Sequence, residues 1–243
     1  MISKNQLKRI KSLHQKKFRL EHNSFIIEGQ KSVQEAISSG LIIECIVLQE
    51  GYESTHFDVQ TFTASSQEMK MLSAMSTAPG ILAVAHFPSW YLANPLPSEV
   101  TSSELILALD GIRDPGNLGT IIRTADWFGL KAIVATKDTV DCFNPKTVQA
   151  SMGSVFRTPV YYTSMTDFLQ ETALPIYGLD LEGENLFEAK LSRGLFVLGN
   201  ESHGIREDLS SLIQHQLHIP GKGDAESLNA AISAAIVMSH LKW

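Results

Sequence analysis

The feature that most constrains the fold is the alternation of short apolar runs with longer helical or loop segments after residue 104. Strands are expected at residues 105–109, 132–135, 155–161, 176–179, 195–198 and 216–219. A strand that helices cover on both faces of a parallel sheet reads as a continuous apolar run. This part of the chain is therefore predicted to be an α/β domain, with a parallel sheet and helices on both of its faces.

The first part of the chain is expected to form a second, smaller α/β domain. Strands are expected at residues 25–27, 42–48 and 81–86, and helices near residues 30–38 and 66–74. Residues 88–103 contain three prolines, several serines and little periodicity, which is typical of a linker. We therefore predict a first domain over residues 1–90, a linker over 91–103 and a second domain over 104–243.

Positive charge is concentrated at the start of the chain, although the formal net charge of the protein is −6. The first 20 residues carry no Asp or Glu and seven basic side chains: Lys4, Lys8, Arg9, Lys11, Lys16, Lys17 and Arg19. The other 13 basic and 26 acidic residues make the rest of the chain acidic. A basic segment on an acidic body can bind a polyanion such as RNA. The alternative is that this segment is a solvated amphipathic helix with no RNA-binding role, because Leu7, Ile10 and Leu13 recur at helical spacing.

The cysteines and the distribution of apolar residues indicate the cellular compartment in which the protein is expected. Cys45 and Cys142 are far apart and belong to no CxxC pair, so neither a disulfide framework nor a metal site is suggested and a reducing cytoplasm fits best. The chain starts with alternating polar and basic residues, and no window approaches the roughly eighteen apolar residues of a membrane span. No secretory leader and no membrane association are expected.

Ligands of parallel α/β sheets bind outside the carboxyl ends of the strands, so the residues after each strand are the candidate site. At the first such exit, Asp114 and Pro115 are suited to cap and begin a helix. The buried stripe of that helix is expected to contain Leu118, Ile121, Ile122 and Ala125. Gly119 and Arg123 then share the opposite side, where the glycine would leave room for a ligand. An ordinary ion pair between Arg123 and Asp126 is the alternative.

Two further exits are rich in glycine and polar residues. Residues 199–204 read GNESHG, and residues 221–226 read GKGDAE. The glycines after the strand at residues 105–109 lack the G-x-G-x-x-G spacing, so a Rossmann dinucleotide site is disfavoured. In the segment that begins at residue 199, Ile205 and Arg206 replace the Lys and Ser/Thr of a phosphate-binding loop, so an NTPase site is disfavoured as well. Ser227 is expected to cap an alanine-rich helix that runs to about Leu241. Taken singly, these segments also fit an ordinary turn and a tightly packed core helix.

Together, the three exits resemble the SpoU, or TrmH-like, family of RNA 2′-O-methyltransferases of the SPOUT superfamily. The resemblance is carried by residues 114–125 (DPGNLGTIIRTA), 198–204 (LGNESHG), 219–220 (IP) and 226–229 (ESLN). Residues 144–146 (NPK) and 150–154 (ASMGS) match a further segment of the family, and residues 11–13 and 25–29 resemble the substrate-binding domain that often precedes it. The likeness covers nearly the whole chain.

The resemblance implies a C-terminal parallel-sheet domain with a deep trefoil knot, preceded by a small α/β substrate-binding domain. It also implies a homodimer, in which the helix that exposes Trp127 and the C-terminal helix meet the partner, and S-adenosyl-L-methionine as the cofactor. The cofactor-binding residues carried over by position are Leu198, Gly199, Asn200, Ile219, Ser227, Leu228 and Asn229. The departures are mild: Gln149 stands where many members have a basic residue, and Ala230-Ala231 follow Asn229 in place of Val-Ser or Val-Ala.

The activity implied by the resemblance is methylation of a ribose 2′-hydroxyl in ribosomal RNA or in transfer RNA. By family analogy Arg123 is catalytic, and Asn117 and Glu201 orient Arg123 and the ribose. Because a guanidinium rarely releases its proton, Arg123 is expected to stabilise the developing oxyanion. Two alternatives stay open: a catalytically inactive RNA-binding protein with the same fold, and a nucleotide-dependent transferase that binds phosphate at its glycine-rich loops.

Overall fold

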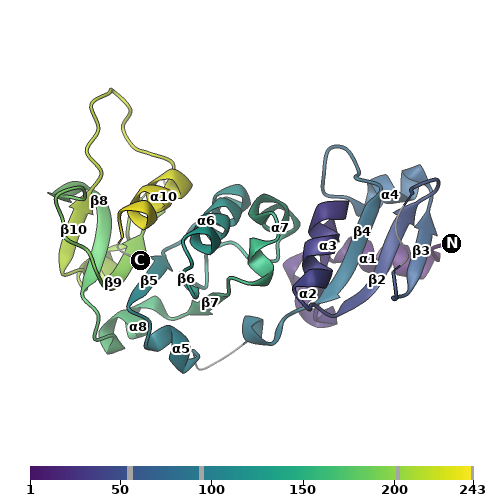
Figure 1. Ribbon diagram of the computed structural model, residues 1–243, viewed down its shortest axis with the longest axis horizontal. Coiled ribbons are helices and arrows are strands. Elements are labelled where there is room, and N and C mark those ends of the chain that lie inside the picture. Colours follow the sequence, from purple (N-terminus) through teal and green to yellow (C-terminus); the bar gives the residue numbers. More distant parts are fainter. Residues whose placement is uncertain (54–56, 93–95, 201–202, 242–243) are drawn as a thin grey trace.

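The computed structural model describes residues 1–53, 57–92, 96–200 and 203–241. The molecule is elongated in Figure 1, with a four-stranded sheet at one end and a six-stranded sheet toward the other. Helices α6 (Pro115–Trp127) and α7 (Pro145–Ser151) lie between the two sheets. Among the described residues, no helix is long and apolar enough to cross a bilayer.

The four-stranded sheet has the order β1-β4-β2-β3, with β4 antiparallel to both of its neighbours and β2 parallel to β3. Its strands are β1 (Ser24–Glu28), β2 (Ile43–Gln49), β3 (Thr61–Ala64) and β4 (Ile81–His86). The helices of this region are α1 (Lys4–Ser12), α2 (Lys16–His22), α3 (Gln30–Ser38) and α4 (Ser66–Leu72). Successive residues of β4 serve opposite faces: Ala83 packs in the apolar cluster that includes α3, and Val84 in the cluster that includes α1 and α4.

The elements predicted for this region are confirmed to within two residues, but β3 and the division of the basic segment into α1 and α2 were not foreseen. Strand β3 is short, lies at the edge of the sheet and alternates threonines with Phe62 and Ala64, so it lacks an apolar run. The break between the two helices falls after Leu13, whose side chain is fully buried. The end of α1 is therefore anchored in the apolar cluster that covers this face of the sheet.

The six-stranded sheet is parallel throughout, with the order β10-β8-β9-β5-β6-β7. Its strands are β5 (Leu105–Leu109), β6 (Ile133–Thr136), β7 (Val160–Thr163), β8 (Ile176–Asn185), β9 (Gly194–Leu198) and β10 (His215–His218). The remaining helices are η1 (Ser89–Leu92), α5 (Ser98–Thr101), η2 (Ser154–Phe156), α8 (Met165–Glu171), α9 (Glu207–Ser210) and α10 (Ala230–His240). The strand predicted at 155–161 was wrong at its start, because Val155 and Phe156 belong to η2 and the strand begins at Val160.

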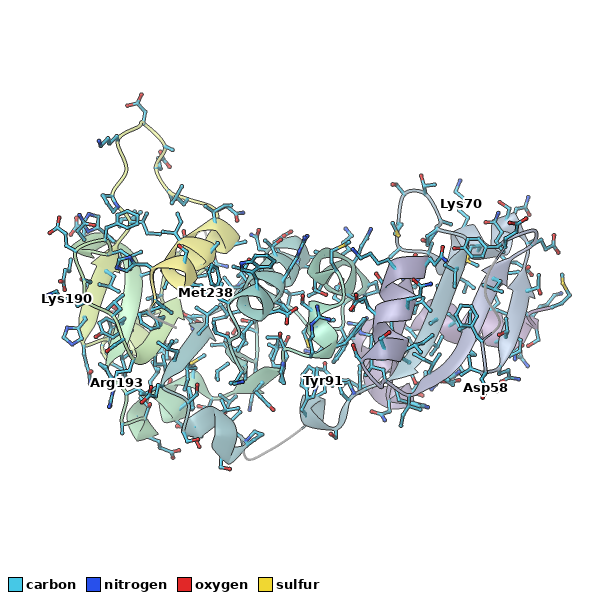
Figure 2. All side chains as sticks on the ribbon, in the orientation of Figure 1. Asp58, Lys70, Tyr91, Lys190, Arg193 and Met238 are labelled. Atoms are coloured by element: carbon cyan, nitrogen blue, oxygen red, sulfur yellow. The ribbon has the colours of Figure 1, made fainter. Side chains whose placement is uncertain are left out.

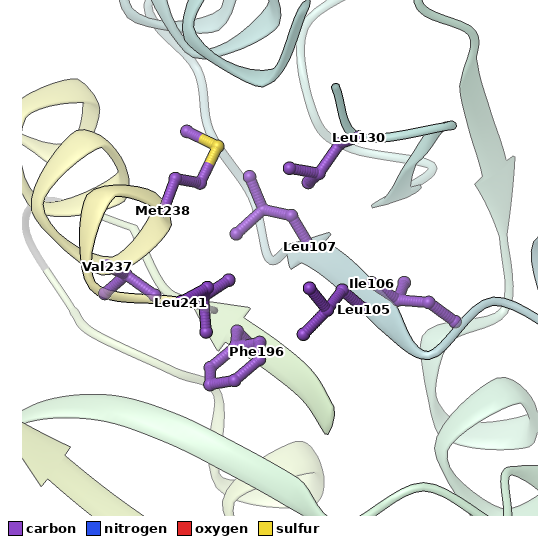
Figure 3. Close-up of a pocket in the computed structure, with 8 residues that line it drawn as sticks. All are labelled: Leu105, Ile106, Leu107, Leu130, Phe196, Val237, Met238 and Leu241. Carbon is purple, nitrogen blue, oxygen red and sulfur yellow. The ribbon is translucent and has the colours of Figure 1, made fainter. Parts of the chain in front are cut away.

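Helices cover both faces of this sheet, which confirms the prediction. Leu107 and Leu109 of β5 pack in one apolar cluster with residues of α6 and α10, whereas Ile106 and Ala108 pack in a second cluster with residues of α8. Figure 3 shows the contact of α10 with the sheet, which leaves no room for a water molecule. Its lining residues are Leu105, Ile106, Leu107, Leu130, Phe196, Val237, Met238 and Leu241. This apolar pocket is therefore filled core and holds no ligand.

A buried polar contact joins the part of the chain before the predicted linker to the part after it. The Arg19 side chain, whose residue is 1% exposed, donates from Nε and Nη2 to Asp141 Oδ2 at 3.0 and 2.5 Å. The Tyr91 hydroxyl donates to Asp141 Oδ1 at 2.7 Å, and Figure 2 shows Tyr91 between the two ends of the molecule. Arg19 is thus wrongly counted among the basic residues that contact RNA, and Arg9 is similarly paired, with Glu44.

Aromatic packing surrounds this ion pair. Phe143 lies 4.3 Å from Phe25 and 4.8 Å from Tyr91 between ring centroids, and Phe87 lies 4.3 Å from Tyr91. Buried aromatic pairs at these separations stabilise a packed interface beyond the area they bury. A second ion pair, between Arg157 Nη1 and Glu35 Oε2 at 3.1 Å, joins η2 to α3 on the surface. The two sheets are therefore held in one packed arrangement.

Candidate functional site

The exits of β5 and β9 lie side by side, because Leu109 and Leu198 are paired in register. The backbone N–H of Asp110 donates to the Leu198 carbonyl at 2.9 Å, and Asn200 Nδ2 donates to the Gly111 carbonyl at 2.8 Å. Two segments that are nearly ninety residues apart are thus tied together where their strands end. This confirms that the first two exits share one edge of the sheet.

The turn after β9 requires a glycine at its first position. The backbone groups of Asn200 and Gly204 exchange two hydrogen bonds of 2.9 Å, which close the turn. A Cβ added at Gly199 would lie 2.1 Å from the Gly204 carbonyl carbon, well inside any allowed contact. Glu201, the third predicted catalytic residue, lies outside the described residues.

A buried carboxylate that the sequence reasoning did not single out supports this turn. Asp110 is 1% exposed, accepts the Arg206 backbone N–H at 2.9 Å through Oδ2 and pairs with Arg206 Nε at 2.9 Å through Oδ1. Burial raises the pKa of the Asp110 carboxyl, and the Arg206 backbone N–H and guanidinium act in the opposite direction. An aspartate directly after an apolar strand was the available signal, since a charge there needs a partner.

The third exit meets the first through two asparagines. Asn229 Oδ1 accepts the backbone N–H groups of Ala231 at 2.9 Å and Ile232 at 3.3 Å, so Asn229 is the N-cap of α10. The expectation that Ser227 caps this helix was wrong, because the helix begins later, at Ala230. Asn229 Nδ2 donates to Asn117 Oδ1 at 2.9 Å, which ties α10 to the first turn of α6.

The loop between β10 and α10 extends away from the body of the protein in Figure 1. Its residues 220–229 are exposed, including Ser227 and Leu228, and Leu228 is 46% exposed. The structure therefore brings Asn229 to Asn117 but leaves Ser227 and Leu228 on an open loop. Their contact with a cofactor stays a prediction.

Backbone groups at the three exits provide the test of whether S-adenosylmethionine fits here. Gly199, Ile219 and Leu228 form no backbone hydrogen bond with the part of the chain that the structure describes. Buried or closed backbone normally pairs its N–H and C=O groups, so unpaired groups at converging strand exits are suited to a ligand. The glycine at 199 itself serves the turn, because the space that a side chain would take is filled by the backbone of Gly204 and Ile205. The residues present fit a cofactor bound largely through backbone.

Arg123 is exposed on α6, and it forms no ion pair or hydrogen bond with a described residue. The alternative pair with Asp126 is wrong, because Asp126 instead binds Arg157 at 2.8 Å and the Ser154 hydroxyl at 2.7 Å. The buried stripe of this helix is confirmed. The proposed space at Gly119 is wrong, since a Cβ there would lie 2.5 Å from Ala150 Cβ on α7. Gly119 serves helix packing, and the catalytic role of Arg123 stays a prediction.

No cluster of three or more His, Cys, Asp or Glu side chains able to hold a metal occurs among the residues the structure describes. The structure combines a parallel α/β sheet, glycine- and asparagine-rich strand exits that are joined by hydrogen bonds, and a smaller α/β unit that is joined to it at Asp141. These features define an α/β protein whose candidate ligand site is at the carboxyl ends of its strands.

Comparison with known proteins identifies the family. Residues 104–239 match the SpoU rRNA Methylase family, and residues 4–83 match the MRM3-like substrate binding domain. The chain is 35% identical over 249 residues to the "23S rRNA (guanosine(2553)-2′-O)-methyltransferase RlmP" of Bacillus subtilis, covering 99% of this chain and 97% of that protein. The chain therefore belongs to the SpoU rRNA methylase family.

Solved structures agree with this assignment across both sheets. A TrmH-family RNA methyltransferase from Porphyromonas gingivalis superposes with a TM-score of 0.84 at 34% identity, covering 99% of this chain and 98% of that one. An AdoMet-bound rRNA methyltransferase from Sinorhizobium meliloti superposes with a TM-score of 0.81 at 27% identity, covering 99% and 95%. The fold is thus that of the SpoU and TrmH methyltransferases, with a substrate-binding domain at its N-terminus.

Proposed function

We propose that this protein methylates a ribose 2′-hydroxyl in ribosomal RNA, with S-adenosylmethionine as the methyl donor. The observation that carries the proposal is the meeting of three family segments, through Leu198, Asn200, Asn117 and Asn229, at one edge of the parallel sheet. The relative from Bacillus subtilis is named for this reaction on 23S rRNA, and it aligns with nearly the whole chain. Transfer RNA is the second candidate substrate.

The cofactor supplies an electrophilic methyl group on sulfur. Leu198, Gly199 and Ile219 would hold it through backbone groups, and Leu228 would close over it from the exposed loop. Asn200 and Asn229 shape the pocket, because each fixes a neighbouring segment through its own side-chain amide. Ser227 lies one residue before Leu228 on the same exposed loop, where it would border the cofactor.

The residues of the chain must position the ribose hydroxyl and favour loss of its proton. A ribose hydroxyl is a poor nucleophile at neutral pH, so charge stabilisation at its oxygen lowers the barrier. Arg123 supplies a positive charge, and it forms no ion pair with an acidic side chain in the part of the chain that the structure describes. Asn117, held by Asn229, and Glu201 would orient the ribose, and the proton would leave to an RNA phosphate or to solvent.

The first 90 residues form the substrate-binding domain in this account, residues 91–103 the linker and residues 104–243 the methyltransferase domain. The exposed basic side chains that remain for RNA phosphates are Lys4, Lys8, Lys11, Lys16 and Lys17. A single-stranded or looped RNA fits best, because the ribose must leave a helical stack to reach the site.

Three further features follow from family membership as proposals. The C-terminal segment, which packs α10 onto α6, threads through a loop of the sheet to form a deep trefoil knot. The protein acts as a homodimer, for which Trp127, 85% exposed, and Ile232, 50% exposed, offer an apolar surface on α6 and α10. It works in the cytoplasm, the reducing compartment that its two free cysteines fit.

The test is direct. Purified protein is incubated with S-adenosylmethionine carrying a labelled methyl group and with ribosomal RNA from cells that lack the protein. We expect one ribose to become resistant to alkaline cleavage at its 3′ side, and that site to be unmethylated in the cells lacking the protein. Calorimetric binding of the cofactor with no methyl transfer to any cellular RNA would favour the inactive RNA-binding protein, and tight ATP binding would favour the nucleotide-dependent transferase.

A further inference from the structure

A cleft of about 430 Å³ lies between a loop of the N-terminal domain and helices α6 and α7. Its walls come from three places in the chain: the loop after α4, the first turn of α6 and the outer side of α7. The lining residues are Ala74, Met75, Ser76, Asp114, Pro115, Gly116, Lys146 and Gln149. The volume falls in the range of small-ligand sites. Gly116 of this lining precedes Asn117 in the chain, so the cleft opens at the same first turn of α6 that carries Asn117.

The loop after α4, which forms the wall from the N-terminal domain, is fixed in place by the half-buried Glu28 carboxylate. Glu28 of β1 accepts the backbone N–H of Ala74 at 2.8 Å through Oε1 and the Ser73 hydroxyl through Oε2. The Ser73 hydroxyl in turn accepts the backbone N–H of Met75 at 3.0 Å. These hydrogen bonds hold the start of the loop on which Met75 and Ser76 line the cleft.

The width of the cleft is set by the domain junction. The Arg19–Asp141 ion pair and the Tyr91 hydroxyl bond hold the four-stranded sheet against the segment that leads into α7. The Arg157–Glu35 pair adds a second tie on the surface. A cleft held on both sides is formed before a ligand arrives, which lowers the entropic cost of binding.

We propose that this cleft binds the base of the nucleotide whose ribose is methylated, and that Gln149 and Lys146 select it. The inference rests on the proposed function and deepens it, because it gives the N-terminal domain a direct part in choosing the target nucleotide. A ribose beside Asn117 carries its base within a few ångströms, and the cleft is the adjoining space. The base would lie between Met75 and the first turn of α6.

The chemistry of the lining fits an unpaired base better than a phosphate. Lys146 is exposed and forms no ion pair with a described residue, but Asp114 faces the same space, so the cleft is close to neutral. The Asp114 carboxylate is also occupied as the helix cap, through the Asn117 N–H at 2.8 Å. The Gln149 amide offers both donors and an acceptor, the Lys146 ammonium offers donors, and the apolar atoms of Met75 and Pro115 offer contact to a ring face.

Photo-crosslinking tests the occupant. A benzoylphenylalanine residue is placed at Met75 in one variant and at Lys190 in the control, and each is irradiated with ribosomal RNA from cells lacking the protein. Lys190 is exposed and lies at the far end of the molecule in Figure 2. We expect the variant at Met75 to crosslink at the methylated nucleotide or its immediate neighbours, and the control not to crosslink there. Crosslinks from Met75 that map to distant nucleotides would overturn the proposal.

Kinetics supply the second measurement. Gln149→Ala and Lys146→Ala should each raise the KM for ribosomal RNA about ten-fold, as expected for one lost base contact, with the affinity for S-adenosylmethionine unchanged. Lys190→Ala should leave both values unchanged. If the wild-type protein methylates RNA but the two cleft variants have unchanged KM values, the proposal that the cleft binds the base is rejected. Absence of methyl transfer by the wild-type protein would instead reject the proposed function, so the two failures are distinguishable.

Discussion

The domain junction and the strand exits use their polar groups differently. At the junction Asp141 is 4% exposed and accepts from Arg19, the Tyr91 hydroxyl and the Phe143 N–H. At the exits, the backbone groups of Gly199 and Ile219 find no hydrogen-bond partner among the described residues. The same chain thus satisfies a buried carboxylate fully at the junction and leaves half-buried backbone groups open at the exits.

The difference teaches which region supplies stability and which supplies binding. A buried ion pair needs partners at every oxygen, because an unpaired charge in the interior is very costly. An open backbone group at the end of a strand costs less, since solvent reaches it, and it becomes useful when a ligand pairs with it. Substitutions at the junction should therefore change stability and spare chemistry, whereas those at the exits should do the reverse.

The largest expected effect is at the junction. Arg19→Ala leaves the Asp141 carboxylate buried without its cation, and we expect the free energy of unfolding to fall by about 3–5 kcal/mol. Urea denaturation measures the loss. Lys17→Ala is the matched control, because Lys17 is exposed on the same helix and should change stability by less than about 0.5 kcal/mol. If the two substitutions lowered the free energy of unfolding equally, the Arg19–Asp141 ion pair would not stabilise the fold.

At the exits the largest effect should be catalytic. Arg123→Ala removes the charge proposed to stabilise the oxyanion, and we expect kcat to fall by about 10²–10³-fold. The unfolding free energy and the affinity for S-adenosylmethionine should stay as in the wild type, because Arg123 bonds to no described residue. Arg193→Ala, at an exposed arginine far from the exits, is the control. Near-normal turnover in Arg123→Ala would exclude the catalytic role.

Asn229 lies where the two roles overlap. Asn229→Ala removes the N-cap of α10 and the bond to Asn117, so we expect about 1 kcal/mol lower stability together with weaker cofactor binding. Ser227→Ala should leave stability unchanged, because Ser227 does not cap the helix. Thermal unfolding of both variants compares them. A loss of stability in Ser227→Ala and none in Asn229→Ala would reverse the assignment of the cap.

The smallest effect tests a surface pair of the N-terminal domain. Hydrogen bonds from the Arg9 guanidinium lower the pKa of the Glu44 carboxyl below its ordinary value of 4.5. A lowered pKa means that the stabilisation is present above the unfolded pKa and is lost as pH falls through the folded one. Glu44→Gln should therefore cost about 0.2–1 kcal/mol at pH 7 and nothing in strong acid. Unfolding curves at both pH values check this, and a loss that persists in acid would contradict the electrostatic account.

Much of the fold could be predicted from the sequence, because buried strands such as β5 and β9 are continuous apolar runs with clear ends. The exits could be predicted for the same reason. The partners of particular side chains could not be predicted. From the local sequence Arg19 is expected on the surface, because its partner Asp141 lies 122 residues later in the chain. Gly119 reads as open space until α7 packs on it, since helical periodicity describes one helix and not its neighbour.

The expectation that Ser227 caps α10 failed for a related reason. Asn229, two residues later, is an equally good N-cap by residue type, and it accepts the N–H groups of Ala231 and Ile232 while its amide is held by Asn117. Long-range pairing therefore sets details that local propensity leaves open. The resemblance to a known family supplied what neither gives, namely the identity of the cofactor.

The central claim is that the open backbone at three strand exits receives S-adenosylmethionine. Hydrogen–deuterium exchange of the protein with and without the cofactor tests it most directly. We predict slower exchange on cofactor binding in residues 198–200 and 219–229, with no change in the cleft residues 74–76 or at the junction around Asp141. Protection confined to the interdomain cleft, with exchange at the three exits unaltered, would contradict the account.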